Sequence, residues 1–217
     1  MTKLYFIRHG KTQWNLERRY QGAKGDSPLL DESFDEIKQL CDFLKTINFV
    51  KAYSSPIKRA RVTAQTIVAK LDQNIPLEVN DAFREFNLGK MEGVKFSDCE
   101  RLYPKEVDAF RNHPEKYDAS KIAGESFEEV FARMTPKIKA ICKRYPNENV
   151  LIVSHGAALC AEIRHLMGIP LEQIRAVGGL NNTSTTILTT LDGQNFKCSA
   201  WNKHDYLVRA LNDSDMV

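Results

Sequence analysis

Two short apolar stretches, each followed after one residue by a histidine and a glycine, constrain the fold of this chain more than any other feature. Residues 4–7 lead into His9 and Gly10, and residues 150–153 lead through Ser154 into His155 and Gly156. A continuous apolar run is typical of a strand buried on both faces, as in a parallel sheet. Because the carboxyl ends of parallel strands meet at one edge, we expect the two histidines to lie together there.

The rest of the hydrophobic pattern alternates between helix and strand. Apolar spacing predicts helices over residues 32–46, 57–71, 127–144 and 157–167, and strands over 49–54, 77–79, 181–191 and 196–201. This order predicts a three-layer α/β sandwich, with a mostly parallel central sheet, helices on both faces and at most one antiparallel edge strand. We expect a single domain over residues 1–217, with a lid or insertion at about 86–125, a loop over 11–26 that closes on the site, and a frayed tail from Asn212.

Composition excludes several classes of protein. The 217 residues are 42% hydrophobic and 27% charged, which is typical of a globular protein. The formal net charge is only +3, and basic residues are interspersed with acidic ones, so the charge does not favour nucleic acid or a membrane surface as a partner. The five cysteines are odd in number and widely spaced, which indicates neither a disulfide framework nor a zinc site. With no signal peptide or membrane span in view, we expect a cytoplasmic monomer or homodimer.

The residues at the predicted sheet edge suit phosphate chemistry. Arg8 offers a planar fork of donors that matches a phosphate, and a neutral imidazole such as that of His9 is nucleophilic near pH 7. Ser55 and Pro56 are expected to cap and to begin the next helix. Arg59, in the first turn of that helix, adds a second donor for an anion.

A candidate general acid follows the strand at 77–79. Glu85 is flanked by apolar residues, and a carboxyl group in apolar surroundings tends to stay protonated, which suits proton donation. Four apolar residues nearby either accept a hydrophobic leaving group or form the core beneath a lid: Phe83, Phe86, Met91 and Phe96.

Five blocks, in this order along the chain, together resemble the histidine phosphatase superfamily, the phosphoglycerate mutase-like group. They are Arg8-His9-Gly10-Lys11-Thr12 with Asn15; Ser54-Ser55-Pro56 with Arg59-Ala60 and Thr63-Ala64; Glu85 with Gly89 and Glu92-Gly93; Gly124-Glu125-Ser126; and Ser154-His155-Gly156. The resemblance implies that His9 is the nucleophile and becomes phosphorylated, and that Glu85 protonates the leaving oxygen. It also implies that the phosphoryl oxygens and the substrate are held by Arg8, Arg59, His155, Asn15, Gln21 and Gly22.

The expected chemistry needs no metal. Negative charge on the transferred phosphoryl group is stabilised by two guanidinium groups and a protonated His155. The same cationic cluster lowers the pKa of His9 and keeps it neutral. The sequence carries neither an Asp-rich magnesium motif nor H-E-x-x-H, and we expect no metal and no cofactor.

Departures from the group's pattern favour hydrolysis over phosphate rearrangement. Mutases usually carry Thr-Gly-Trp after the first strand and Glu-Arg-His-Tyr-Gly around the acid, where this chain has Gln21-Gly22-Ala23 and Glu85-Phe86-Asn87-Leu88-Gly89. A mutase holds a bisphosphate while it reorients and needs extra cationic contacts. We therefore predict a histidine acid-type phosphatase acting on a small-molecule phosphate ester. The alternatives are a phosphoglycerate mutase, with 2,3-bisphosphoglycerate as its cofactor, and a non-catalytic phosphate-binding module.

Overall fold

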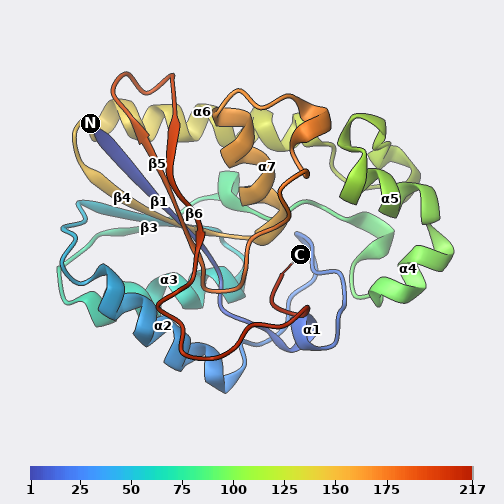
Figure 1. Cartoon of the computed structure of the whole chain (residues 1–217), viewed down its shortest axis with the longest axis horizontal. Coiled ribbons are helices and arrows are strands. Elements are labelled where there is room, and N and C mark those ends of the chain that lie inside the picture. The colour runs from blue at the N-terminus through green and yellow to red at the C-terminus, as the bar shows by residue number, and fades with distance from the viewer. Residues whose placement is uncertain (217) are drawn as a thin grey trace.

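A six-stranded sheet forms the middle layer of the protein (Figure 1). The computed structural model describes residues 1–216 of the chain. The strands stand in the order β3-β2-β4-β1-β5-β6, with bounds β1 (Thr2–Arg8), β2 (Lys51–Ser54), β3 (Leu77–Val79), β4 (Asn149–Ser154), β5 (Thr185–Thr190) and β6 (Lys197–Lys203). β1 to β4 are parallel, as predicted. The antiparallel strand expected at the edge is instead β5, which lies inside the sheet because β6 pairs with its outer side.

Helices cover both faces of this sheet (Figure 1). Their bounds are α1 (Gln13–Leu16), α2 (Asp31–Leu44), α3 (Lys58–Leu71), α4 (Phe96–Leu102), α5 (Pro104–Asn112), α6 (Phe127–Arg144) and α7 (Gly156–Leu166), with short 3₁₀ turns at Asp81–Phe83, Gly89–Met91, Pro114–Lys116, Ala119–Ile122 and Leu171–Gln173. The three-layer α/β prediction is confirmed, and the four predicted helices differ from the observed ones by at most two residues at each end. None of the helices within residues 1–216 is long and apolar enough to cross a membrane.

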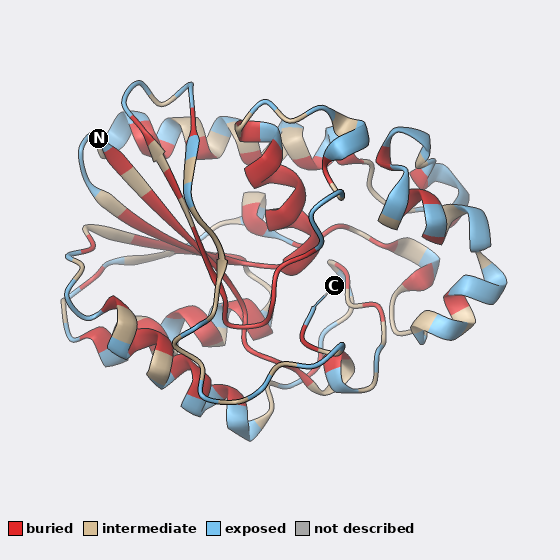
Figure 2. Cartoon of the chain, in the orientation of Figure 1, coloured by how far each residue is buried: buried red, intermediate tan, exposed pale blue. Residues whose placement is uncertain are grey.

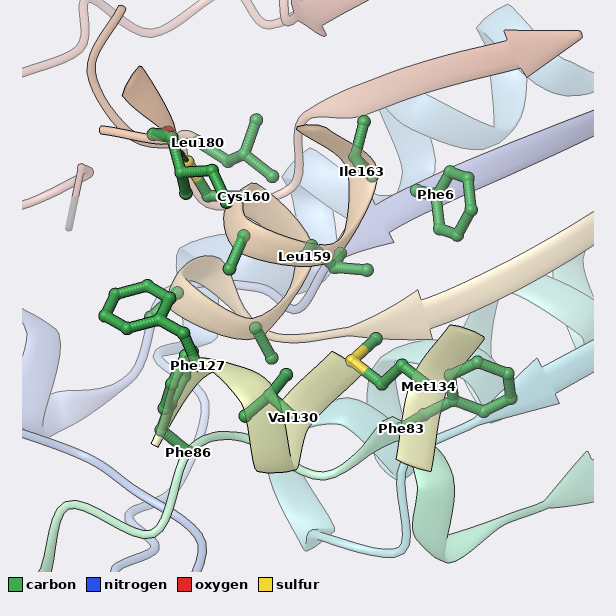
Figure 3. Packing of buried hydrophobic residues seen from close by; sticks show 14 of the residues in the cluster. Phe6, Phe83, Phe86, Phe127, Val130, Met134, Leu159, Cys160, Ile163 and Leu180 are labelled. Carbon is green, nitrogen blue, oxygen red and sulfur yellow. Dashed lines mark hydrogen bonds between the residues drawn. The ribbon is translucent and has the colours of Figure 1, made fainter. Parts of the chain in front are cut away.

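The apolar run of β1 is continuous because each face of the sheet has its own core. Leu4 and Phe6 pack on the side of α6 and α7, against residues such as Met134 (Figure 3). Tyr5 and Ile7 point to the other side, into the cluster made with α2 and α3. Alternate side chains of one strand thus enter two cores, and Figure 2 shows the strands as a buried layer between them.

The register of the two central strands places the histidines side by side. Arg8 of β1 pairs with Ser154 of β4, and both strands end there. The next residues, His9 and His155, therefore leave the sheet at the same edge, and their ring centroids are 5.2 Å apart. The predicted meeting of the two His-Gly segments is confirmed.

Local sequence signals decide where two of the helices begin. At α6 the predicted capping box is present: the Ser126 hydroxyl accepts a hydrogen bond from the Glu129 amide at 3.2 Å, and the Glu129 carboxylate accepts one from the Ser126 amide. At α3 the expected cap is wrong. The helix begins at Lys58, after Ile57; the Ser55 hydroxyl lies 2.7 Å from Nε2 of His155 and accepts a hydrogen bond from the Ile57 amide at 3.2 Å, ahead of the helix.

The carboxyl-terminal tail is docked, which corrects the expectation that it frays. Asp215 is fully buried, and its carboxylate pairs with Lys11 at 3.1 Å and with Arg209 at 2.6 Å. Its carbonyl oxygen accepts a hydrogen bond from Arg8 at 2.7 Å. Lys11 and Arg8 are far away in sequence, so the tail by itself does not signal its docking against them.

The segments expected to cover the site also contain helices. Residues 11–26, predicted as a loop, include α1, whose cap is the side chain of Thr12. Residues 96–122 form α4, α5 and two 3₁₀ turns, which lie beyond the carboxyl ends of the strands (Figure 1). Both segments therefore lie next to the edge that carries His9.

Candidate active site

His9 lies one residue beyond β1, and its side chain is buried. Its Nδ1 is 2.8 Å from the Gly10 carbonyl oxygen, and its Nε2 is 3.2 Å from Nε of Arg59. A carbonyl only accepts and a guanidinium only donates, so Nδ1 carries the proton and Nε2 keeps its lone pair. Burial, Arg59 and Arg8 hold the pKa of His9 well below 6.5. The ring is therefore neutral, as predicted, and Nε2 is its unprotonated nitrogen.

Arg59 joins His9 to the loop that follows α1. It is the second residue of α3, and only 1% of its surface is exposed. One of its terminal nitrogens donates to the Gly25 carbonyl at 2.7 Å, and the other donates to the Gly22 carbonyl at 3.1 Å. The Asp26 carboxylate lies 3.3 Å away. Burial lowers the pKa of Arg59, and nearby carboxylates oppose that effect.

Arg8 lies behind His9 and bonds to two carbonyl oxygens. It donates to Leu180 and to Asp215, and its Nε has no partner within residues 1–216. Burial lowers its pKa to about 10. The close approach depends on Gly156, because a Cβ atom there would lie 3.0 Å from Nε of Arg8.

His155 is fully buried at the start of α7. Its Nε2 is 2.7 Å from the Ser55 hydroxyl, and its Nδ1 has no partner in the described part of the chain. Burial and Arg59 lower its pKa well below 6.5. The ring is therefore neutral in this structure, and the protonated His155 expected beside a transferred phosphoryl group stays a prediction. Sequence alone could not show that burial and a neighbouring cation act together on this ring.

Glu85 faces the amino end of α7. Its Oε1 accepts hydrogen bonds from the Ala158 amide at 2.7 Å and the Phe86 amide at 2.9 Å, and its Oε2 accepts one from the Ala157 amide at 3.1 Å. The prediction of apolar surroundings for Glu85 is therefore wrong at the carboxylate itself, because three backbone N–H groups donate to it. These contacts fix the group beside the pocket that contains His9.

A small pocket lies in front of His9. Its volume is about 20 Å³. Five of the expected site residues line it: Arg8, His9, Asn15, Gln21 and Glu85. Two aromatic residues of the α4–α5 segment, Phe96 and Phe110, complete this part of the lining. Arg59 and His155 do not line the pocket but lie against His9, which does. Gly22 does not line it either, and its carbonyl oxygen accepts a hydrogen bond from Arg59. A volume of this size holds about one water molecule.

Hydrogen bonds fix the polar groups at the pocket entrance. The Gln21 amide donates to the Thr12 hydroxyl at 2.6 Å, and the same hydroxyl donates to Asn15 at 2.9 Å. Of the four apolar residues near the acid, only Phe96 lines the pocket; Phe83, Phe86 and Met91 are fully buried and belong to the core.

Three further residues position the site, and their roles were not predicted. Glu92 accepts hydrogen bonds from the amides of Lys24 and Leu88, at 2.9 and 3.0 Å, and so holds the loop around Arg59. Asn182 donates to the His9 carbonyl at 3.1 Å, and Arg133 donates to the Glu85 carbonyl at 3.3 Å. Of the three, only Asn182 carries a sequence signal: it lies in a run of polar residues, 181–184, directly before β5, and such a run is unusual next to a buried strand.

Comparison with known proteins agrees with this geometry. A family model described as "Histidine phosphatase superfamily (branch 1)" matches residues 4–204. The chain belongs to the histidine phosphatase superfamily.

Within residues 1–216 there is no group of three or more His, Cys, Asp or Glu side chains arranged to hold a metal ion.

Relatives in this superfamily carry both phosphatase and mutase names. "Phosphoglycerate mutase-like protein 4" of Arabidopsis thaliana is 30% identical over 94% of this chain and 86% of its own length. "Uncharacterized phosphatase PhoE" of Bacillus subtilis is 31% identical over 77% of this chain and 79% of its own. The solved structure of Bacillus stearothermophilus YhfR superposes with a TM-score of 0.85 at 31% identity, covering 94% of this chain and 99% of that one.

Proposed function

We propose that this protein is a metal-independent phosphomonoester hydrolase that works through a phosphohistidine at His9. The observation that carries the proposal is the pair of hydrogen bonds on the His9 ring, which puts the proton on Nδ1 and leaves Nε2 unprotonated, accepting from Arg59. Membership of the histidine phosphatase superfamily and a phosphatase-named relative support it. Arg8 and Arg59 supply the positive charge, so neither a metal nor an organic cofactor is needed.

In the first step Nε2 of His9 attacks the phosphorus, and the bond from phosphorus to the ester oxygen breaks. Glu85 gives the leaving oxygen its proton. Oε2 is the better placed of its two oxygens to carry this proton, because it accepts one backbone hydrogen bond whereas Oε1 accepts two. The negative charge on the phosphoryl oxygens is stabilised by Arg59 and Arg8, in a site from which water is largely excluded.

In the second step a water molecule attacks the phosphohistidine. Glu85 takes the proton of that water, inorganic phosphate leaves, and His9 returns to its neutral form. His155, Asn15 and Gln21 are proposed to hold the phosphoryl oxygens through both steps. A bound dianion would raise the proton affinity of His155, which is neutral before substrate arrives.

The test combines product analysis with trapping of the intermediate. Wild-type protein should release inorganic phosphate from an aryl phosphate, and rapid quenching after mixing with a radioactively labelled ester should give a label that is acid-labile and stable in alkali. His9→Ala should lower kcat by at least roughly a thousandfold and abolish the label. His165→Ala is the matched control, because His165 is an exposed histidine stacked on Phe131. Equal activity in wild type and His9→Ala would contradict the mechanism.

A phosphoglycerate mutase is the second candidate, because one relative over nearly the whole chain is named mutase-like. It makes a different product from the same phosphohistidine. With 3-phosphoglycerate and 2,3-bisphosphoglycerate together, a mutase forms 2-phosphoglycerate faster than phosphate is released. We expect release of phosphate to be faster.

A further inference from the structure

An apolar pocket lies beside the last strand of the sheet, apart from the phosphoryl site. Its volume of about 350 Å³ is within the range of pockets that hold small molecules. It forms where the end of α7 and the chain that follows meet β6, and its lining includes Met167, Ile169, Ala176, Val177, Cys198 and Trp201. All of its lining residues differ from those of the pocket in front of His9, so the two are separate sites.

The apolar side chains of this pocket are only partly covered by the protein. Met167, Ile169 and Trp201 are half-buried against the core on the α6 and α7 side of the sheet. Val177 is 66% exposed. Apolar surface in contact with water is unfavourable, and flexible methionine and branched aliphatic side chains adapt to an apolar ligand. An acyl chain laid on this surface would remove it from water.

One charged side chain, that of Arg164, lines the same pocket. It lies in the last turn of α7, and only 5% of its surface is exposed. The central carbon of its guanidinium is 4.6 Å from the ring centroid of Trp201. One terminal nitrogen donates to the carbonyl oxygens of Gln173 and Ile174, at 3.1 and 2.9 Å. Because these contacts already order the cation, little of its side-chain freedom remains to be lost on binding an anion.

The charge of Arg164 is not balanced by a carboxylate. Within residues 1–216 it pairs with no Asp or Glu side chain, and the ionisable groups that act on its pKa are two thiols and the like-charged Arg175. Burial lowers the pKa of this guanidinium, which means that its charged form is disfavoured there. Its Nε is also buried without a hydrogen-bond partner in the described part of the chain. An anion entering the pocket would therefore stabilise a buried cation that the protein leaves unpaired.

The charge pattern of β6 disfavours a second copy of the chain as the occupant. β6 begins at Lys197 and ends at Lys203. A two-fold pairing of two β6 strands would place Lys197 of one copy opposite Lys203 of the other, and like charges opposite each other destabilise strand pairs. Lysines on an edge strand commonly oppose such pairing. A small amphipathic anion meets no such repulsion.

We propose that this pocket binds the anion of a medium-chain fatty acid, with its carboxylate on Arg164 and its acyl chain along Met167 and Val177. A carboxylate matches the planar donor fork of an arginine, and one carboxylate balances the one charged residue on the lining. The acyl chain covers the exposed apolar wall. The inference is independent of the proposed hydrolase function, because no residue of the phosphoryl pocket takes part in it.

The test uses decanoate and decanol, which have the same chain and differ in the charge of the head group. The protein has two tryptophans, Trp14 and Trp201, so Trp14→Phe leaves Trp201 as the single fluorescent reporter, and this background is used throughout. Decanoate below its micellar concentration should change the Trp201 fluorescence, and calorimetry should give one molecule bound per chain. Decanol should bind roughly tenfold more weakly or worse, the usual effect of losing a hydrogen bond between charged groups.

Two variants test the pocket itself. Arg164→Gln should raise the Kd of decanoate by roughly tenfold or more and leave that of decanol within about twofold. Arg144→Gln is its control, because Arg144 also stacks on an aromatic ring, that of Tyr145, and should change neither value.

If Arg164→Gln does not fold, Val177→Glu carries the test, because this exposed position accepts a carboxylate that repels the ligand and competes for Arg164. It should weaken decanoate binding much more than decanol binding. Val208→Glu, at another exposed valine outside the pocket, is the matched control and should bind both ligands as the parent protein does.

Three binding results would overturn this inference: decanoate does not bind, decanol binds as tightly as decanoate, or Arg164→Gln and Val177→Glu each weaken both ligands equally. A dimer in sedimentation that Val177→Glu converts to a monomer would also overturn it, because a second copy would then cover the pocket. The assay contains no phosphate ester, so its outcome and that of the hydrolase test are read separately.

Discussion

The chemistry of the site depends on the protonation of single buried residues. His9 and His155 are both neutral here, but for His9 the hydrogen bond to the Gly10 carbonyl also decides which nitrogen carries the proton. Arg8 is held by two carbonyl oxygens rather than by a carboxylate, so its charge is not neutralised at the contact. Single residues therefore set which nitrogen of His9 is unprotonated and how much positive charge surrounds it.

Glu162 provides a prediction about stability at the same scale. It is fully buried in α7, its Oε1 accepts a hydrogen bond from Thr135 at 2.8 Å, and its Oε2 has no partner within the described residues. Burial raises its pKa from 4.5 to about 8. The folded protein therefore holds a proton that the unfolded chain releases above pH 4.5. The contribution of this group to stability is greatest below pH 4.5 and falls as pH rises to 8, by about 3 kcal/mol at pH 7.

Glu162→Gln should remove this pH dependence. Urea unfolding at pH 5 and at pH 8 measures it: wild type should lose stability between the two, and the variant should lose much less. Glu172→Gln, at an exposed position, is the control and should behave as wild type. A variant that is less stable than wild type at pH 8 would show that the carboxyl group is not the source of the slope.

At the scale of elements, the docked tail is the least expected feature. Residues 205–216 pass from β6 to the active-site edge, and Asp215 links Lys11 to Arg209, which also pairs with Glu36 of α2. The tail thus ties the first loop of the chain to α2. It also supplies the carbonyl oxygen that orients Arg8, so its docking bears on the phosphoryl site.

Asp215→Asn should loosen this tail. Breaking a buried ion pair on one side costs roughly 3 kcal/mol, because Lys11 is left buried without its partner. We expect faster hydrogen exchange in residues 205–216 and a fall of about tenfold in kcat/KM. Asp205→Asn is the control, because Asp205 is exposed and pairs only with Lys203. An unchanged exchange rate in Asp215→Asn would show that the backbone contacts alone hold the tail.

At the scale of the whole molecule, one sheet separates two hydrophobic cores. Met134 lies in the core under α6, and Ile67 lies in the core under α3. The strands contribute to both cores through alternate side chains, so loss of either core exposes the same sheet. We therefore propose that residues 1–217 unfold as a single domain.

Paired core variants test this proposal. Met134→Ala and Ile67→Ala should each cost about 2–5 kcal/mol. Each should shift one common unfolding transition, followed by fluorescence and by far-ultraviolet circular dichroism, and the double variant should cost nearly the sum. Two separate transitions in either single variant would mean that the cores belong to independent units. Val208→Ala, at an exposed position, is the control and should shift nothing.

Much of the fold could be predicted because its signals are local. The continuous apolar runs at β1 and β4 predict buried parallel strands, and the capping box at Ser126 and Glu129 predicts the start of α6. The same reasoning brings His9 and His155 to one edge, because strand ends in a parallel sheet share an edge. Periodicity and capping depend on neighbours in sequence, so the sequence by itself determined these elements.

The tertiary structure alone decided what depends on partners far apart in the chain. The neutral state of His155 follows from burial beside Arg59, the contact of Ser55 with His155 joins residues that follow two different strands, and the docked tail follows from Asp215 meeting Lys11. No local pattern records such meetings, because electrostatic and hydrogen-bond energies depend on distance in space and on the exclusion of water.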